Sequence, residues 1–296
     1  MRFPWKMLVA VAAVLFMTTA IALTVALGRN GPESRPAAIS SADLTTLEFA
    51  ERIDVGKCMA DRGFRYLPEP PTPAERRFTY VLDDVAWARQ HGYGIVPASD
   101  VAVTGTNERY FASLSPDRRV QAVAALAGSH GEVTVSVPGG GVVGSATDGC
   151  TALAQQRLYG DFPTWFHAKI ITANLELSYV PRVRSDPAFI RALGEWSRCM
   201  GGRGFSTTGP NNLAEQLSDR IRGRTTADAR DLEIETAVAE ATCARQTLLA
   251  TTAEGLDRRY RTETEARYHS EIQIRDRLRE AALPHARQIV SAYRPG

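Results

Sequence analysis

Two seven-residue stretches of this chain share the pattern Cys-Met-x-x-Arg-Gly-Phe. They read CMADRGF at residues 58–64 and CMGGRGF at residues 199–205. Glycine adopts the left-handed backbone conformation just past a helix end, where a residue with a side chain is strained. In such a Schellman motif, the residue after the glycine contacts a residue in the last helical turn. Both stretches therefore predict a helix stop.

Each predicted helix stop places a cysteine beside a clamp made of methionine and phenylalanine. The clamp residues are Met59, Gly63 and Phe64 in the first copy, and Met200, Gly204 and Phe205 in the second. One further cysteine follows each copy, so the four cysteines are Cys58, Cys150, Cys199 and Cys243. Four cysteines allow three pairings. The duplication favours Cys58–Cys150 and Cys199–Cys243 as structural disulfides over the two crossed pairings.

The N-terminal residues bear on the compartment. Residues 7–27 carry no charged side chain and would span roughly 30 Å as a helix, close to the hydrocarbon thickness of a membrane. Arg2 and Lys6 precede them, so the positive-inside rule predicts that residues 1–6 are cytoplasmic and the rest is exported. The predicted localisation is a single-pass cell-membrane protein with its C-terminal part outside. The alternative is a cleaved signal peptide followed by secretion.

The exported part is predicted to be mainly α-helical. Residues 28–41 are rich in proline, glycine and serine, which predicts a disordered linker. Two disulfide-stapled helical units are predicted to follow, at residues 42–183 and 184–296, and the second ends in long C-terminal helices. Residues 132–137 alternate valine with polar residues and predict a strand. The first unit therefore contains a small β-hairpin or a loop insertion.

Two helix starts are predicted from capping residues followed by proline. Ser115 with Pro116 and Asp186 with Pro187 each place a capping side chain before a proline at the first helical position. The second of these helices carries one apolar stripe, made of Phe189, Leu193, Trp196 and Met200.

Three further helical stretches are predicted from apolar spacing. A helix is predicted over residues 73–91, because Thr72 would cap it and apolar residues recur at helical intervals. Residues 164–179 predict another helix. Residues 226–292 predict one or two long helices with a break at Pro284, because proline lacks the backbone N–H that a helix interior needs.

Several stretches resemble a group of exported or membrane-anchored actinobacterial proteins. They are the duplicated Cys-Met-x-x-x-Gly-Phe motif, SDPAFIRALGEWSRCM at residues 185–200, ARQHGYGI at residues 88–95 and NERYFASLSPDRR at residues 107–119. That group has no assigned activity. The resemblance therefore implies export and a helical, cysteine-paired architecture, and it carries no catalytic residue to this chain.

No cofactor or metal site is predicted. Gly139, Gly141 and Gly144 follow a predicted strand and precede a predicted helix, which is the order of a dinucleotide-binding loop. No series of alternating strands and helices surrounds them, so the stretch is interpreted as a plain loop. The cysteines form no Cys-x-x-Cys pair and have no histidine at ligand spacing.

No catalytic constellation is predicted either. The histidines are His91, His130, His167, His269 and His285, and none has a sequence neighbour suited to a triad. Two adjacent carboxyls, Asp83 and Asp84, are expected inside a helix, where they would point about 100° apart and could not flank one substrate bond. The net charge of only +2 argues against nucleic acid as a partner.

These observations favour a non-catalytic cell-envelope module that binds a protein or cell-wall partner and is attached to the plasma membrane through residues 7–27. One alternative is an exported, hydrolase-like enzyme whose site is assembled from scattered Asp, Glu and His side chains. Another is a thiol redox sensor. A deep pocket that gathers such side chains would favour the enzyme, whereas a broad surface patch would favour binding.

Overall fold

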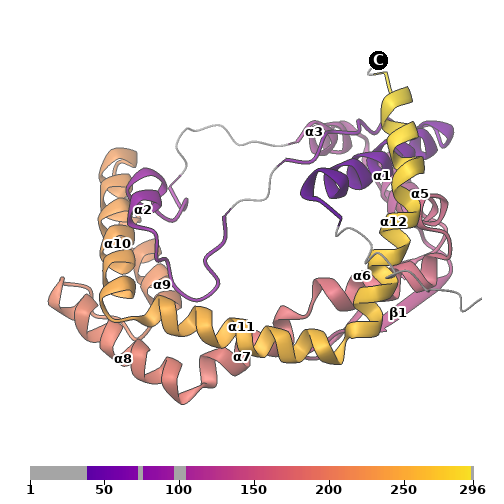
Figure 1. The fold of residues 1–296 in the computed structure, drawn as a ribbon. Helices are drawn as coiled ribbons and strands as arrows, with labels where there is room; N and C mark the ends of the chain where they lie inside the picture. The colour runs from indigo at the N-terminus through magenta and orange to yellow at the C-terminus, as the bar shows by residue number, and fades with distance from the viewer. Residues whose placement is uncertain (1–38, 73–75, 97–104, 295–296) are drawn as a thin grey trace, which may run out of the picture. The chain divides into compact units, whose positions relative to one another are not determined.

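The computed structural model describes residues 39–72, 76–96 and 105–294 (Figure 1). The predicted anchor at residues 7–27 lies outside this part of the chain, as does nearly all of the predicted linker. Residues 39–296 form one compact unit. Of the helices within the described ranges, none is both long enough and apolar enough to cross a membrane.

The described part of the chain is mainly α-helical, as predicted. Its elements, in chain order, are α1 (Ser41–Asp61), α2 (Val85–His91), α3 (Thr106–Ser113), α4 (Pro116–Ala127), β1 (Glu132–Ser136), β2 (Val142–Ala146), α5 (Cys150–Tyr159), α6 (Phe162–Ala173), α7 (Glu176–Ser185), α8 (Pro187–Gly202), α9 (Pro210–Ile221), α10 (Thr226–Gln246), α11 (Leu249–Arg267) and α12 (His269–Ala292).

Both predicted helix stops are confirmed, at the ends of α1 and α8. The Phe64 N–H donates to the Met59 carbonyl at 2.9 Å, and the Phe205 N–H donates to the Met200 carbonyl at 3.0 Å. The glycines before the two phenylalanines have φ angles of +77° and +86°, as the Schellman motif requires. All four clamp side chains are buried. Each motif therefore ends a helix and fixes an apolar contact at that end.

The predicted disulfides, Cys58–Cys150 and Cys199–Cys243, are both present. Their first cysteines lie in the last turns of α1 and α8. Their second cysteines are placed differently, since Cys150 begins α5 whereas Cys243 lies in the last turn of α10. The duplication therefore extends to the helix stop and its cysteine, and not to the helix that each cysteine joins.

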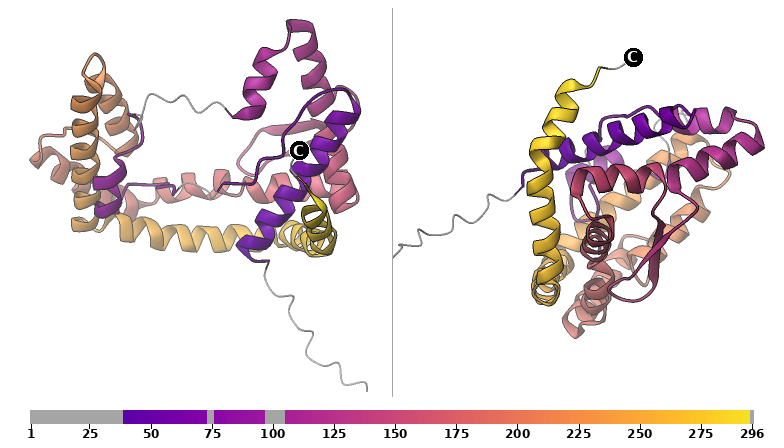
Figure 2. Two further views of the ribbon diagram at one scale, coloured as in Figure 1. Left: turned by 90° about the horizontal axis from the view of Figure 1, so that it is seen from above. Right: turned by 90° about the vertical axis from the view of Figure 1, so that its right-hand side faces the viewer.

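One core cluster packs the C-terminal helix α12 against α1, α5 and α6 (Figures 1 and 2). Its buried side chains are Leu47, Ala50 and Ile53 of α1, Leu158 and Tyr159 of α5, Trp165 of α6, and Ala282, Ala286 and Ile289 of α12. An ion pair of 2.8 Å between Arg287 of α12 and Asp43 of α1 also joins these two long helices. The last helix of the chain thus completes the core around the first.

A second core cluster surrounds the Cys199–Cys243 disulfide and joins α8, α10 and α11. The predicted stripe on α8 lies in it, with Trp196 and Met200 fully buried and Leu193 partly buried. Helix α2, from the predicted first unit, packs on α10 of the second. Each predicted unit therefore contributes a helix to the core of the other: α2 packs on α10, and α12 packs on α1.

The predicted helix over residues 73–91 is wrong for most of its described part. Residues 76–84 are not helical and bend at Thr79 and Tyr80, and the helix begins only at Val85, capped by Asp84, whose side chain accepts the Trp87 N–H. The Leu82 N–H instead donates to the buried carboxylate of Glu240 at 2.8 Å. Asp83 and Asp84 therefore do not lie within a helix. The backbone just before them is hydrogen-bonded to Glu240 instead of to a helical turn.

Two other predictions need correction. The predicted helix at residues 164–179 is divided at Asn174, whose side-chain amide donates to the Ile170 carbonyl at 2.7 Å and caps α6. The C-terminal stretch forms three helices. Its breaks lie at Leu248, which has a φ of +59°, and at Tyr268, whereas α12 continues through Pro284.

The insertion is a β-hairpin. Strands β1 and β2 pair antiparallel, with Glu132 opposite Ala146, and Val135 and Val137 turn inward to the core beside α6. The three glycines at residues 139–141 have φ angles between +88° and +111° and form its turn. An antiparallel pair with this tight turn has no place for the parallel crossover of a dinucleotide-binding fold.

Candidate functional site

A non-helical segment, residues 76–84, crosses the helices around the second disulfide, and we refer to it as the strap. Its Val81 belongs to the buried cluster that contains Trp196 of α8, and its Leu82 packs with Ala237 of α10. Arg184 of α7 donates to the Thr79 carbonyl at 3.0 Å. The strap is thus held by three helices that lie about 100 residues or more further along the chain.

The segment after α2 is held by a buried carboxylate of α10. Glu233, which is fully buried, accepts the backbone N–H groups of Tyr93 and Ile95 at 2.8 Å and that of Val96 at 3.2 Å. Arg230 pairs with the same carboxylate at 3.2 Å. The charge of Glu233 is therefore compensated by one cation and three backbone donors.

A second buried carboxylate, Glu240, lies on the same helix and is only 2% exposed. It accepts the Leu82 N–H and the Tyr93 hydroxyl. Burial raises the pKa of Glu240 to about 7, and the two hydrogen bonds oppose that rise only in part. Burial and the adjacent carboxylate also raise the pKa of the Tyr93 hydroxyl. Unlike Glu233, Glu240 takes part in no ion pair among the described residues.

A hollow of about 270 Å³ lies between the strap, α2 and α9, with Glu240 in its lining. Aromatic side chains dominate its wall, namely Phe78, Tyr80, Trp87 and Tyr93. Its polar groups include Asn211 and Arg76. An apolar wall with a few converging polar groups is the usual composition of a ligand-binding site.

A row of neighbouring side chains, one cation followed by aromatic rings, borders this hollow. The guanidinium of Arg76 lies 4.9 Å from the ring centre of Phe78, and it pairs with Asp84 at 2.6 Å. Phe78 meets Trp87 edge to face at 5.0 Å, and Trp87 stacks on His91 at 4.7 Å. Because Arg76 already has its own carboxylate, it leaves the charge of Glu240 uncompensated.

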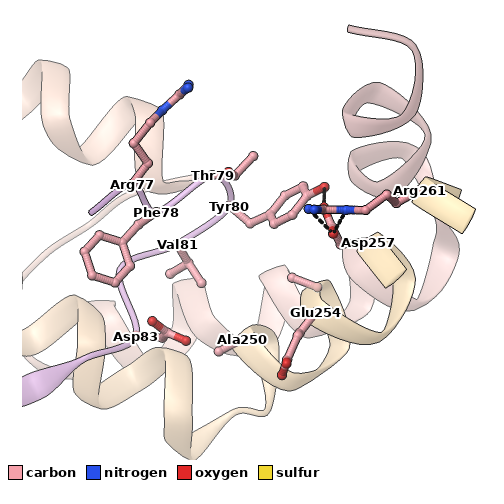
Figure 3. A pocket seen from close by; sticks show the side chains of 11 residues that line it. Arg77, Phe78, Thr79, Tyr80, Val81, Asp83, Ala250, Glu254, Asp257 and Arg261 are labelled. Carbon is pink, nitrogen blue, oxygen red and sulfur yellow. Dashed lines mark hydrogen bonds and ion pairs between the residues drawn. The ribbon is translucent and has the colours of Figure 1, made fainter. Parts of the chain in front are cut away.

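A smaller hollow, of about 210 Å³, lies on the other side of the strap (Figure 3). Tyr80 points into it toward Asp257 and Arg261, and its hydroxyl donates to Asp257 at 2.8 Å. Arg261 donates twice to the same carboxylate, at 2.7 and 3.0 Å. Burial and the bond to Asp257 raise the pKa of Tyr80. This network is closed, since its carboxylate has a cation and its phenol has an acceptor.

One group of side chains imitates a catalytic triad without its geometry. Asp148 accepts from His130 Nδ1 at 3.0 Å, and the Ser129 hydroxyl lies 2.9 Å from that same nitrogen. A triad needs the serine and the carboxylate on opposite ring nitrogens. Asp148 also accepts the backbone N–H groups of Ser129 and His130, and these bonds lower its pKa to about 2. The group therefore fixes the start of the hairpin.

All four cysteines are engaged in disulfides, and none remains as a thiol. Within the described ranges, no cluster of three or more His, Cys, Asp and Glu side chains could hold a metal ion. The predicted clamp residues and cysteines lie in the cores and not at the hollows beside the strap.

No family model, no curated protein and no solved structure matches this chain. The resemblance to exported actinobacterial proteins therefore stays a prediction. Sequence reasoning identified none of the residues around the strap as a site. The stretch ARQHGYGI contains His91 and Tyr93, and it is the only motif of the sequence analysis that includes residues beside this hollow.

Proposed function

We propose that the chain is a non-catalytic module of the cell envelope that binds a partner at the hollow between the strap, α2 and α9. One observation supports this most strongly: aromatic side chains from the strap and from α2 meet polar groups of α9 and α10 in one surface hollow. Aromatic rings of this kind supply much of the binding energy at recognition surfaces. The anchor at residues 7–27 would hold this surface outside the cell membrane.

Hydrolase-like chemistry has one observation in its favour, which is the raised pKa of Glu240 in the lining of a hollow. Glycoside hydrolysis needs two carboxyls that flank one substrate bond. The other buried carboxylate of α10, Glu233, is committed to Arg230 and three backbone donors. Binding therefore fits the arrangement better than catalysis does. Redox sensing fits less well, because one cysteine of each disulfide, Cys150 or Cys243, is fully buried and so is shielded from an attacking thiol.

Site-specific photo-crosslinking of the full-length chain, in cells that export it, tests the proposal. A photoreactive residue at exposed Asn211, which lines the hollow, should form an adduct with an envelope component. The matched control is Arg222, which is also exposed and follows α9 but is absent from that lining. Trp87→Ala should weaken the adduct at position 211. The same adduct at both positions, or none at position 211, would contradict the proposal.

A further inference from the structure

We infer that the hollow beside the strap recognises an alkylammonium group, with Glu240 as its counter-charge and the surrounding rings as its wall. The inference rests on the proposed binding function and specifies the chemistry of the ligand. Cations such as a lysine ammonium bind to the faces of aromatic rings, and quaternary ammonium groups are held in this way in aromatic cages. The rings of Phe78, Trp87 and Tyr93 and the carboxyl of Glu240 meet in its lining.

The two buried carboxylates on α10 differ in whether a cation lies beside them. Glu233 has Arg230 at 3.2 Å, so its negative charge already has a cation. Among the residues that the structure describes, Glu240 has only neutral donors, the Leu82 N–H and the Tyr93 hydroxyl. A buried carboxylate without a cation is costly. A cation that enters the hollow would supply the partner that the protein itself provides for Glu233.

The groups that face Glu240 from the packed elements leave its charge free. From the strap, Arg76 is paired with Asp84, and Tyr80 is bonded to Asp257 on the far side. From the segment after α2, Tyr93 donates a neutral hydroxyl. The residues of α9 in the lining, Pro210, Asn211 and Ala214, do not titrate. The guanidinium over Phe78 also shows that this aromatic surface accepts a cation.

The size of the hollow limits the ligand. A volume of about 270 Å³ is at the small end for a ligand pocket, so it suits one ammonium head with a short alkyl chain. Such a group occurs on a lysine side chain and on a choline headgroup. The two sources share a cationic nitrogen with a short alkyl chain. They differ in the methyl groups on nitrogen and in the rest of the chain, which carries an oxygen in choline.

Titration calorimetry of the full-length chain in a non-ionic detergent tests the inference without any substitution. The probes are choline and butylammonium, each compared with a neutral molecule of the same shape, 3,3-dimethylbutan-1-ol and 1-butanol. At pH 8 we expect at least one cation to bind about tenfold more tightly than its neutral counterpart. The advantage should fall at pH 5.5, because Glu240 is then protonated. A preference for choline indicates a headgroup, and a preference for butylammonium indicates a lysine-like side chain.

Glu240→Gln keeps an acceptor for Leu82 and removes the charge, so it should abolish the preference for cations while neutral binding persists. Glu235→Gln, an exposed position on the same helix, is the matched control and should change neither. Equal binding of each cation and its neutral counterpart by the unaltered protein would overturn the inference. If the crosslink at position 211 forms while no cation is preferred, the binding function stands and the alkylammonium ligand falls.

Discussion

Glu240 links the stability of the fold to pH. Its pKa is about 7 in the folded chain, against an ordinary value of 4.5, so the folded chain holds this proton more tightly than the unfolded chain. The resulting stabilisation is complete below pH 4.5 and is lost as the pH rises through 7. A shift of this size corresponds to about 3 kcal/mol of unfolding free energy.

We expect Glu240→Gln to remove this part of the pH dependence. Between pH 4.5 and 8, the unfolding free energy of the variant should fall less than that of the unaltered chain, by about 3 kcal/mol over the range. Urea unfolding followed by circular dichroism at several pH values measures the difference. Glu235→Gln serves as the control, and a parallel pH profile for all three proteins would contradict the assignment.

Two glycines, Gly194 within α8 and Gly204 just past its end, should respond oppositely to the same substitution. Gly204 lies past the helix end with a φ of +86°, so Gly204→Ala forces alanine into the left-handed region and should cost about 1–2 kcal/mol. Gly194 is exposed in the helix interior with open space around it, so Gly194→Ala should stabilise the fold by about 1 kcal/mol. Thermal unfolding of both variants measures the signs. A stabilising Gly204→Ala would show that the Schellman geometry is not maintained.

Short sequence motifs predict the structural role of some residues and not of others. Gly63 and Gly204 need a left-handed backbone whatever surrounds them, and the repeated cysteines narrowed the pairing. Glu233 and Glu240 look like ordinary charged residues of a solvated helix. Apart from Arg230, their hydrogen-bond partners lie 137 to 158 residues away, so no pattern within α10 could indicate burial.

At the scale of elements, the strap shows why apolar spacing misled. Phe78, Leu82 and Val85 do recur at helical intervals, and all three pack against α10. Within the strap, however, the Leu82 N–H donates to the Glu240 side chain of α10, and the Thr79 carbonyl accepts from Arg184 of α7, so neither group makes a helical hydrogen bond. The site beside the strap could not be predicted for the same reason, because its walls come from four segments that only the tertiary fold brings together.

Pro284 should be a weak point of α12. It lies in the helix interior, is exposed, and lacks the N–H that would bond to the preceding turn. Pro284→Ala should therefore stabilise the protein, by up to about 3 kcal/mol. Pro187→Ala, at the first turn of α8, removes no helical hydrogen bond and should be nearly neutral. Equal melting temperatures for Pro284→Ala and the unaltered chain would mean that α12 needs its proline to pack on α1.

At the scale of the whole described chain, two core regions exchange segments, and one disulfide joins helices of each region, α1 to α5 and α8 to α10. The C-terminal helix α12 completes the core around α1, whereas α2 and the strap complete the core around α8 and α10. The disulfides close loops of 92 and 44 residues, which in the chain-entropy model stabilise the fold by about 4 to 5 kcal/mol each. Each core is thus stapled locally and completed by a distant part of the chain.

This exchange predicts that the two cores unfold together. Ile289 of α12 is buried in the first core, so Ile289→Ala should cost about 2–5 kcal/mol. If the cores are coupled, hydrogen exchange should quicken in α8 and α10 as well as in α1 and α5. Ile190→Ala, at an exposed position of α8, is the control and should alter little. Faster exchange confined to α1, α5, α6 and α12 would show that each disulfide holds an independent folding unit, and the strap would then join two domains.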